Sequence, residues 1–517
     1  MAPVQKYIPF FSSALLMCIA LFFIYPHYQY YIDPDGTAYL TISQRYANGD
    51  YQHAINGYWS PWSCWLTALI IKAGLSAIPA SVIINAFGAI GFLFISQSLF
   101  LKFKIITRLQ WLLNSSLAFF LCYAVFWQSF DDLWECFFLL GTLRLMLIDE
   151  YKSKPALWLL FGITGALAYF AKAYSFPFFI LNTICCVYFI CKDNKTQWLK
   201  ISFVSIASMM LCSLPWIIAL HSKYGIWTTS TSGSLNMSWY LVGHPHWKEG
   251  IDLLIPPAYK DSPYYWEDPY FANGDTPHFW SSFHLFGLQL LRIGYNLLKF
   301  IKSMLQISVF FPVIVMVLIK FITNKQARVT TAPTFTVALS FLLFPLGYML
   351  VNFESRYIWY MLPLCMLAGS LFIQNHLSGT GKNYVKILPW VFVLSFLIYP
   401  VWGMMSMFNE GANEYKIAEQ LKHMNIHGSF ICMAKPGAEV QRIERLAYFS
   451  GNQFYSLAKS VEAQKDLLGE MRRYHVNYYF AYGESAKEFS FNDEQGKPFP
   501  ELTNYGIKGL KVFVVNP

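Results

Sequence analysis

Residues 8–25 read IPFFSSALLMCIALFFIY, an apolar run of 18 residues without a charged side chain. A helix rises about 1.5 Å per residue, so this run is long enough to cross most of a hydrocarbon core of ~30 Å. It lacks a small-residue cleavage site and a strongly basic start, which indicates a retained helix rather than a removed signal peptide. The run therefore predicts the first membrane-spanning helix.

Apolar runs of similar length recur along the first four fifths of the chain. Of its 517 residues, 56% are hydrophobic and only 13% are charged, which is unlike a soluble protein of this size. The sequence therefore predicts a polytopic α-helical membrane protein with about eleven transmembrane helices. Besides the first, the predicted spans are residues 80–100, 111–127, 133–148, 156–170, 175–191, 201–220, 301–320, 335–351, 360–373 and 387–404.

The basic residues predict the orientation of these helices. If the N-terminus lies inside, every inside loop is basic, and the outside turns at residues 128–132 and 352–357 are acidic or mixed, as the positive-inside rule expects. Residues 62–75 form a shorter run that carries Lys72, so they predict an interfacial helix. The formal charge of +9 comes from separate short loops and does not indicate a nucleic-acid partner. The inside loops carry Lys102, Lys104, Arg108, Lys152, Lys154, Lys192, Lys195, Lys200, Lys320, Lys325, Arg328, Lys382 and Lys386.

Three segments are predicted outside: loops 26–79 and 221–292 of a membrane module that spans residues 1–407, and the tail 408–517. The second loop is rich in Trp and Tyr, which form membrane-surface belts or stack on sugars. In the tail the hydrophobic period changes, which predicts a small α/β domain with a scaffold or acceptor-recognition role. Its predicted strands are residues 429–434, 453–457, 476–482 and 511–515, and its helices are residues 413–424, 440–450 and 461–474.

Charged side chains gather at the outer ends of the predicted spans. Residues 33–43 read DPDGTAYLTIS, so Asp33 and Asp35 come soon after the first span. Acids placed where a membrane helix meets water can act on a substrate whose tail is in lipid and whose head is in solvent. Together the clusters predict carboxylates for a base or a metal and cations for a phosphate. The other clusters are Asp131 with Asp132, Lys172, and Glu354 with Arg356 and Tyr357.

Each cluster also has a structural interpretation. Asp35 is equally suited to cap a helix, and so are the two acids at 131 and 132. Lys172 and Arg356 are placed where basic side chains reach lipid headgroups. The functional interpretation depends on the joint pattern, because all of these clusters lie on the predicted outer side and the outer turns carry few other charges.

The order of these motifs resembles the GT-C superfamily of integral-membrane glycosyltransferases, in the branch of the bacterial aminoarabinose transferases and the protein O-mannosyltransferases. The resemblance covers nearly the whole chain. It rests on Asp35-x-x-x-Tyr39, Tyr58-Trp-Ser-Pro61-Trp-Ser-Cys-Trp65, Asp131-Asp132, Leu167-Ala-Tyr-Phe-Ala-Lys172 and Glu354-Ser-Arg356-Tyr357-Ile-Trp-Tyr-Met-Leu-Pro363.

This resemblance implies an inverting hexosyl- or pentosyltransferase that takes a sugar from a polyprenyl-phosphate donor. Asp35 would be the general base, assisted by Asp33, and Lys172 with Arg356 would hold the donor phosphate next to Tyr357. Substrate-binding residues would be Asp131, Asp132, Tyr39, Tyr58 and Glu354. A divalent cation, Mg²⁺ or Mn²⁺, is compatible with the aspartate pairs, with Asp33 and Asp131 as its ligands.

The same resemblance implies a bacterial inner membrane with the site and the tail facing the periplasm, and a lipid, a glycan or a protein as acceptor. Two other interpretations remain at this level. A polysaccharide polymerase or a transporter of lipid-linked sugars would share the outer aromatic loop, but a transporter is expected to place charges near the bilayer midplane. A scaffold whose tail binds a partner would not need the acids.

Overall fold

The computed structural model describes the chain except for residues 1–2, 128–129, 244–253, 273–275, 325–331, 378–382, 435–436, 458–463, 484–485, 487–488, 504–505 and 516–517. Lys325, Arg328, Lys382 and the first residues of the helix predicted at 461–474 lie outside the described residues.

A helix occupies each position that was predicted to span the membrane. Six of the described helices are long and apolar enough to cross a membrane, or up to seven if one bent pair counts as a span. The chain is therefore an integral membrane protein, while the count of about eleven crossings stays a prediction. The helices are α1 (Ile8–Tyr28), α5 (Ala77–Lys102), α6 (Thr107–Phe126), α7 (Phe130–Met146), α8 (Pro155–Ala171), α9 (Ser175–Ile190), α10 (Lys195–Tyr224), α12 (Phe283–Ile307), α13 (Phe311–Thr323), α15 (Ala332–Leu343), α16 (Leu346–Leu350), α17 (Met361–Leu377), α18 (Asn383–Leu394) and α19 (Ile398–Met407).

The predicted span at residues 301–320 is not one continuous helix. The chain breaks between α12 and α13, and the two helices are bent by 116° relative to each other. Ser308 adopts an extended backbone (φ −163°, ψ 138°) after the last turn of α12, and Pro312 begins the next helix, where its missing N–H costs nothing. Helix α12 itself starts at Phe283, well before the predicted span.

Two short helices follow the first span, α2 (Pro34–Asn48) and α4 (Trp62–Lys72), with the single turn α3 (Tyr51–Ala54) between them. Helix α4 agrees with the predicted interfacial helix. Helix α2 has Asp33 as its N-cap and Pro34 as its first residue. Asp35 is therefore not the cap: it lies in the first turn, with its carboxylate available for other partners.

The described part of the second outer loop contains α11 (Ser232–Val242), the two-residue strand β1 (Leu254–Ile255) and the 3-10 turns η4 (Tyr265–Glu267), η5 (Pro269–Phe271) and η6 (Phe279–Ser281). Elsewhere the described residues form the 3-10 turns η1 (Pro3–Tyr7), η2 (Asp149–Lys152) and η7 (Ser355–Ile358). The turns η4 and η7 matter most here, because they approach the acids of α2.

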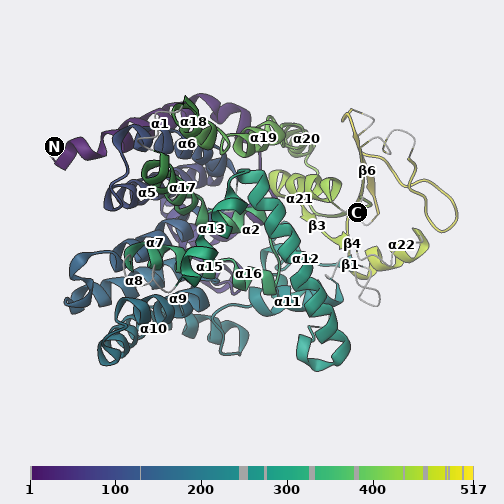
Figure 1. Cartoon of the computed structure of the whole chain (residues 1–517). Coiled ribbons are helices and arrows are strands. Elements are labelled where there is room, and N and C mark those ends of the chain that lie inside the picture. The colour runs from purple at the N-terminus through teal and green to yellow at the C-terminus, as the bar shows by residue number, and fades with distance from the viewer. Residues whose placement is uncertain are drawn as a thin grey trace.

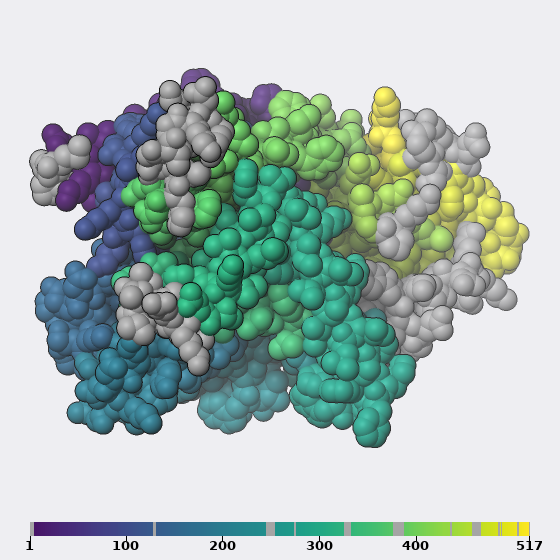
Figure 2. All heavy atoms as spheres, in the orientation of Figure 1, coloured from purple at the N-terminus to yellow at the C-terminus, as the bar shows by residue number. Residues whose placement is uncertain are grey.

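The C-terminal region is a four-stranded sheet with helices, and it lies beside one end of the helical body, away from the N-terminus (Figures 1 and 2). The strand order is β3-β2-β5-β6, parallel except for the β5–β6 pair. The predicted strand 453–457 divides in two: β3 joins this sheet, whereas β4 pairs with β1 of the outer loop. The elements are α20 (Ala412–His423), β2 (Ser429–Cys432), α21 (Ala438–Ser450), β3 (Gln453–Phe454), β4 (Ser456–Leu457), α22 (Gln464–Arg473), β5 (Tyr478–Tyr482) and β6 (Leu510–Val514).

Candidate active site

The two acids of the first pair have different partners: Asp33 accepts a backbone hydrogen bond, whereas Asp35 contacts side chains. The Asp33 carboxylate accepts a hydrogen bond from the Gly36 backbone N–H at 2.6 Å and so caps α2. Asp35 faces the other way: its Oδ2 lies 2.8 Å from Arg356 Nη2, and its Oδ1 accepts a hydrogen bond of 3.1 Å from Trp266 Nε1. Only 21% of the Asp35 side chain is exposed, so this carboxylate is both held and partly accessible.

Arg356 connects three carboxylates that come from three parts of the chain. Besides Asp35, its Nε donates to Glu354 at 2.8 Å, and its Nη1 lies 3.8 Å from Asp132 Oδ2. The pKa of Arg356 lies well above its ordinary value because these acids outweigh the burial that opposes its charge. The guanidinium therefore stays charged at any pH at which the protein is folded.

Lys172 forms the second cationic arm of the site. It lies in the turn between α8 and α9, forms an ion pair with Asp132, and has Glu135 Oε2 at 3.9 Å. The ring of Tyr357 lies beneath its ammonium group, 4.4 Å from the centroid. Asp132 is thus shared by Lys172 and Arg356, and the two cations lie on either side of one buried carboxylate.

Asp131 is turned away from these cations. It accepts hydrogen bonds from Ser63 of α4 and from Tyr39 of α2, and its side chain is buried. Asp131 and Tyr39 therefore join α4 and α2 to the start of α7, next to Asp132. The predicted metal pair of Asp33 and Asp131 thus has other partners for both members.

Tyr58 belongs to an aromatic cluster beside Asp35. Its ring contacts Trp59, Trp239 and Trp266, and its hydroxyl donates to Asn236 at 2.9 Å. Burial and the Asp35 charge raise the pKa of Tyr58, so its hydroxyl stays protonated. The cluster supplies flat apolar faces next to a carboxylate, a combination that suits a sugar ring.

Three residues of the site were not predicted. Glu135 is buried one turn after Asp132 and accepts a hydrogen bond from Ser175 at 3.0 Å. Tyr348 lies under Lys172 as a second ring, and Trp266 holds Asp35 from the outer loop. Glu135 had a sequence signal, since it is a charged residue inside a predicted span; the role of Trp266 could not be separated from that of the other tryptophans of its loop.

The loop that carries Trp266 is anchored by buried ion pairs. Glu267 pairs with Arg45 of α2, and Asp268 lies 3.0 Å from Lys223 of α10. The Arg45 guanidinium also contacts Asp261 at 2.9 Å, and only 5% of its side chain is exposed. These contacts fix the loop that in turn holds Asp35.

We expect Arg45→Met to lower the free energy of unfolding by about 3–5 kcal/mol, because it leaves the buried Glu267 charge unpaired. Thermal unfolding of the purified protein in detergent measures this. The double variant Arg45→Met, Glu267→Gln should recover part of the loss. A double variant that is as unstable as the two single variants added together would contradict the pairing.

Residues of the C-terminal region contact the segment that precedes Asp33 and Asp35. Arg445 of α21, with 2% of its side chain exposed, donates from Nε to the Ile32 carbonyl at 2.8 Å and pairs with Glu410. The rings of Tyr30 and Tyr415 stack at 4.3 Å. Gly411 is required here, since a Cβ at this position would lie 2.0 Å from the Tyr30 carbonyl oxygen.

A further acid reaches this area from the same helix. Glu444 is 95% buried; burial, then Asp35 and Asp33, raise its pKa to about 8. At neutral pH this side chain is therefore mostly protonated. The acids of the first outer loop thus have a largely neutral carboxyl from the C-terminal region as a neighbour.

Burial and the neighbouring Asp35 also raise the pKa of Asp33. The folded protein therefore keeps a proton on Asp33 that the unfolded chain loses near pH ~4, so this group lowers stability progressively as pH rises toward the native pKa. We expect Asp33→Asn, which keeps the helix cap, to gain unfolding temperature relative to the parent over that pH range. Parallel melting curves for the two proteins from pH 4 to pH 9 would contradict the shift.

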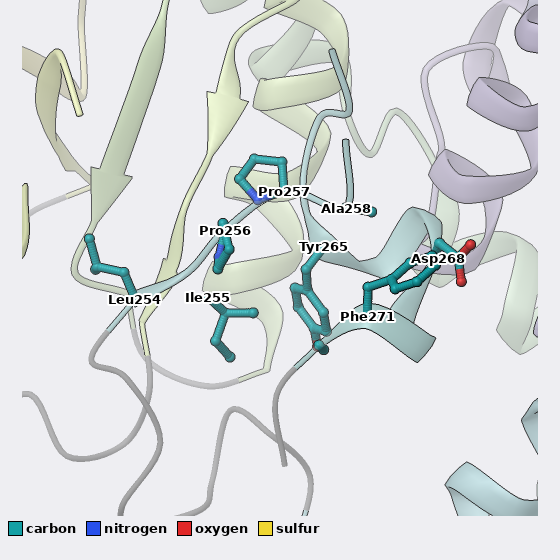
Figure 3. A pocket seen from close by; sticks show the side chains of 9 residues that line it. Leu254, Ile255, Pro256, Pro257, Ala258, Tyr265, Asp268 and Phe271 are labelled. Carbon is teal, nitrogen blue, oxygen red and sulfur yellow. The ribbon is translucent and has the colours of Figure 1, made fainter. Parts of the chain in front are cut away.

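The described residues contain no group of three or more His, Cys, Asp or Glu side chains placed to hold a metal ion. A cavity of about 140 Å³ lies between β1 and the turns η4 and η5, apart from the acids. Figure 3 shows that it is lined by Pro256, Pro257 and Tyr265, and that the Asp268 carboxylate points away from the prolines. Asp268 also lines this cavity, but its carboxylate already pairs with Lys223.

Comparison with known proteins gives a match in structure but not in sequence. No protein-family model matches the chain, and no curated protein matches its sequence. The crystal structure of ArnT from Cupriavidus metallidurans bound to undecaprenyl phosphate aligns with 99% of this chain and 98% of its own, at 10% identity and a TM-score of 0.57.

Two other membrane enzymes align over part of their length. The arabinofuranosyltransferase AftD from Mycobacteria has a TM-score of 0.51 at 11% identity and covers 100% of this chain but 42% of its own. The oligosaccharyltransferase of Archaeoglobus fulgidus has a TM-score of 0.50 at 11% identity, covering 93% of this chain and 69% of its own. All three are GT-C glycosyltransferases. The fold that the resemblance implied is therefore confirmed: this chain has the fold of these GT-C structures.

Proposed function

We propose that the protein is an inverting glycosyltransferase that moves a sugar from a polyprenyl-phosphate-linked donor to a hydroxyl group of an acceptor. The observation that carries this proposal is the arrangement of Asp35, Arg356 and Lys172. A partly exposed carboxylate contacts one of two cations, and those cations meet at a single buried acid. A base beside two anion-binding groups is what such a transfer needs.

The chemistry follows from this arrangement. The acceptor hydroxyl gives its proton to Asp35 as its oxygen forms a bond to the anomeric carbon. The bond from that carbon to the donor phosphate breaks, and its electron pair leaves with the phosphate oxygen. One displacement inverts the anomeric centre. The phosphate goes from one negative charge to two, so Arg356 and Lys172 bind the leaving group more tightly than the donor.

Arg356 also links donor binding to the base. In this arrangement its guanidinium donates to Asp35 Oδ2, so that oxygen is occupied. A donor phosphate competes for the same guanidinium. When Arg356 turns to the phosphate, Asp35 Oδ2 is released and can take the acceptor proton. The acceptor would therefore be activated only after the donor is in place.

The membrane part offers a place for a long apolar chain. An open groove of about 510 Å³ runs between α1, α4, α5 and α7, with an almost entirely apolar lining. Trp134, one of its lining residues, lies on α7 two residues from Asp132. The donor's isoprenoid chain is the occupant that we propose for it. The undecaprenyl phosphate bound by the similar ArnT protein supports a donor of this kind.

We place the site on the outer face of a bacterial inner membrane, with the C-terminal region in the periplasm, because the inside loops predicted from the sequence are basic. The acceptor would be a lipid, a glycan or a protein of the cell envelope. The proposal includes a divalent cation, Mg²⁺ or Mn²⁺, only as an ion that binds together with the donor phosphate.

The test is transfer of radiolabelled sugar by the purified protein from a panel of polyprenyl-phosphate sugars, with membrane extract as the acceptor source. We expect transfer from at least one donor, and its inversion can be read from the anomeric configuration of the product. A chelator lane tests the cation. No transfer from any donor by folded protein would overturn the proposal in favour of a polymerase or a transporter of lipid-linked sugars.

A further inference from the structure

A second pair of cations lies near the site, outside the set that the proposed transfer uses. Arg292 donates from Nη2 to the Asn352 side-chain oxygen at 2.8 Å, and Lys299 Nζ lies 3.4 Å from the same oxygen. Arg292 also donates to the Val351 carbonyl at 3.4 Å. Two positive charges therefore converge on one neutral acceptor atom, which leaves most of their charge uncompensated.

No described carboxylate lies within ion-pair distance of either cation. Glu354 is the acid that faces them across Asn352, but its Oε2 accepts from Arg356 and its Oε1 from Asn352 Nδ2 at 3.3 Å. The ring of Tyr240, 4.2 Å from the Arg292 guanidinium, adds a flat wall and no charge. An anion is the partner that this arrangement lacks.

The helix that carries both cations lies where a lipid can reach them. Arg292 and Lys299 are seven residues apart, two turns of α12, and so share one face with Asn296, whose amide donates to the Met349 carbonyl at 2.9 Å. Large apolar residues remain exposed on the same helix: Phe283, Phe286, Leu290, Leu291, Leu298 and Leu305. A helix with cations on its polar side and exposed apolar side chains is typical of the headgroup level of a membrane.

Asn352 connects this pair to the reacting groups. Its amide nitrogen donates to Glu354, Glu354 accepts from Arg356, and Arg356 pairs with Asp35. An anion held by Arg292 and Lys299 would therefore lie two side chains from Arg356, beside the proposed transfer site but distinct from the donor phosphate position.

We propose that Arg292, Lys299 and Asn352 form a second anion site, which binds the phosphate of a lipid headgroup, and that this lipid is the acceptor. The anion site rests on the contacts of α12, and its assignment to the acceptor rests on the proposed glycosyltransferase function. The lipid chains lie along the exposed apolar side of α12. The phosphate holds the headgroup so that a hydroxyl group reaches Asp35.

Binding tests the anion site without any transfer. Calorimetric titration of the full protein in neutral detergent with dioctanoyl phosphatidic acid should give binding, while dioctanoylglycerol and inorganic phosphate should each bind at least about tenfold more weakly. The double variant Arg292→Gln, Lys299→Gln should lose this binding by about tenfold or more, since two charge-assisted hydrogen bonds are removed. Lys302→Gln, an exposed neighbour on α12, is the matched control and should bind like the parent.

Three binding results would overturn the anion site: no binding of phosphatidic acid, equal binding by the double variant, or inorganic phosphate that binds as tightly as the lipid. If the double variant does not fold, Lys299→Gln alone decides, because among the described residues Lys299 contacts just Asn352, at 3.4 Å, and the Tyr295 ring, at 5.2 Å, and so carries little of the fold. These outcomes hold even if the protein transfers no sugar, so failure of the proposed function is separable from failure of the site.

Kinetics test the acceptor assignment. With active protein, the double variant should raise the KM for the membrane-extract acceptor about tenfold and leave the KM for the donor unchanged. Phosphatase treatment of the acceptor should produce the same increase with the parent protein and no further increase with the variant. An unchanged acceptor KM would assign the pair to bulk membrane lipid, and a raised donor KM would assign it to the donor; either overturns the acceptor assignment.

Discussion

Asp35→Asn should reduce sugar transfer by about 10²–10⁴-fold while leaving the donor bound, because the amide cannot take the acceptor proton. Asparagine keeps the shape of the side chain and can still accept the hydrogen bond from Trp266 Nε1. Binding of the donor should even tighten, since the variant no longer occupies the Arg356 guanidinium with a negative charge. Single-turnover transfer and equilibrium binding of a polyprenyl-phosphate lipid measure the two effects.

Asp33→Asn is the matched control for this experiment. It lies two residues away and makes the same change from carboxyl to amide, but the Asp33 side chain caps α2. We expect it to lose far less activity than Asp35→Asn. If Asp33→Asn is the worse of the two, Asp33 and not Asp35 is the base, and equal losses would contradict the assignment of Asp35 as the sole base.

Arg356→Met should lower kcat by about 10²–10³-fold, although it frees Asp35 Oδ2 from its ion pair. The Asp35 carboxylate becomes more accessible, but the leaving phosphate loses the cation that compensates its second negative charge. The variant also removes one ion-pair partner from each of three carboxylates, those of Glu354, Asp35 and Asp132. Lys172→Met should show a loss of the same order, because Lys172 and Arg356 flank one acid.

Conservative variants separate this explanation from misfolding. Arg356→Lys keeps the charge but reaches fewer acids, so it should retain more activity than Arg356→Met. The slower kcat should be accompanied by a weaker affinity for polyprenyl phosphate, the leaving group, measured with the purified protein. Normal affinity for polyprenyl phosphate in both Met variants would contradict the assignment of the two cations to that phosphate.

The sequence was sufficient for the helices and insufficient for their breaks. Apolar runs marked a helix at each position predicted to span the membrane, because leucine, isoleucine and phenylalanine side chains are driven out of water. The apolar run at 301–320 did not predict the break within it, where Ser308 is extended and α12 and α13 are bent by 116° relative to each other. That turn is what brings α12 and its cations alongside residues 349–352.

Asp35, Asp132, Lys172 and Arg356 could be named from the sequence, but their pairing could not, and Glu135, Tyr348 and Trp266 were missed. Asp35 and Arg356 are 321 positions apart, and Lys172 and Asp132 are 40 apart. The charge pattern predicted that such residues share one side of a membrane, yet only the fold decides which carboxylate meets which cation. The sequence did not indicate a role for Arg292 and Lys299, because that role depends on the single Asn352 amide oxygen that both contact in the folded chain.

The contact of Arg445 with the Ile32 carbonyl also has a consequence for protein engineering. Swapping C-terminal regions between homologous enzymes is a common way to seek new acceptors. In this protein the graft would have to include residues 27–33 of the first outer loop with residues 409–445, because His27, Tyr30 and Ile32 pack on Asn409, Tyr415 and Arg445. In a chimera joined only at the end of α19, the new C-terminal region would not match the surface formed by residues 27–33, which precede Asp35, the proposed base.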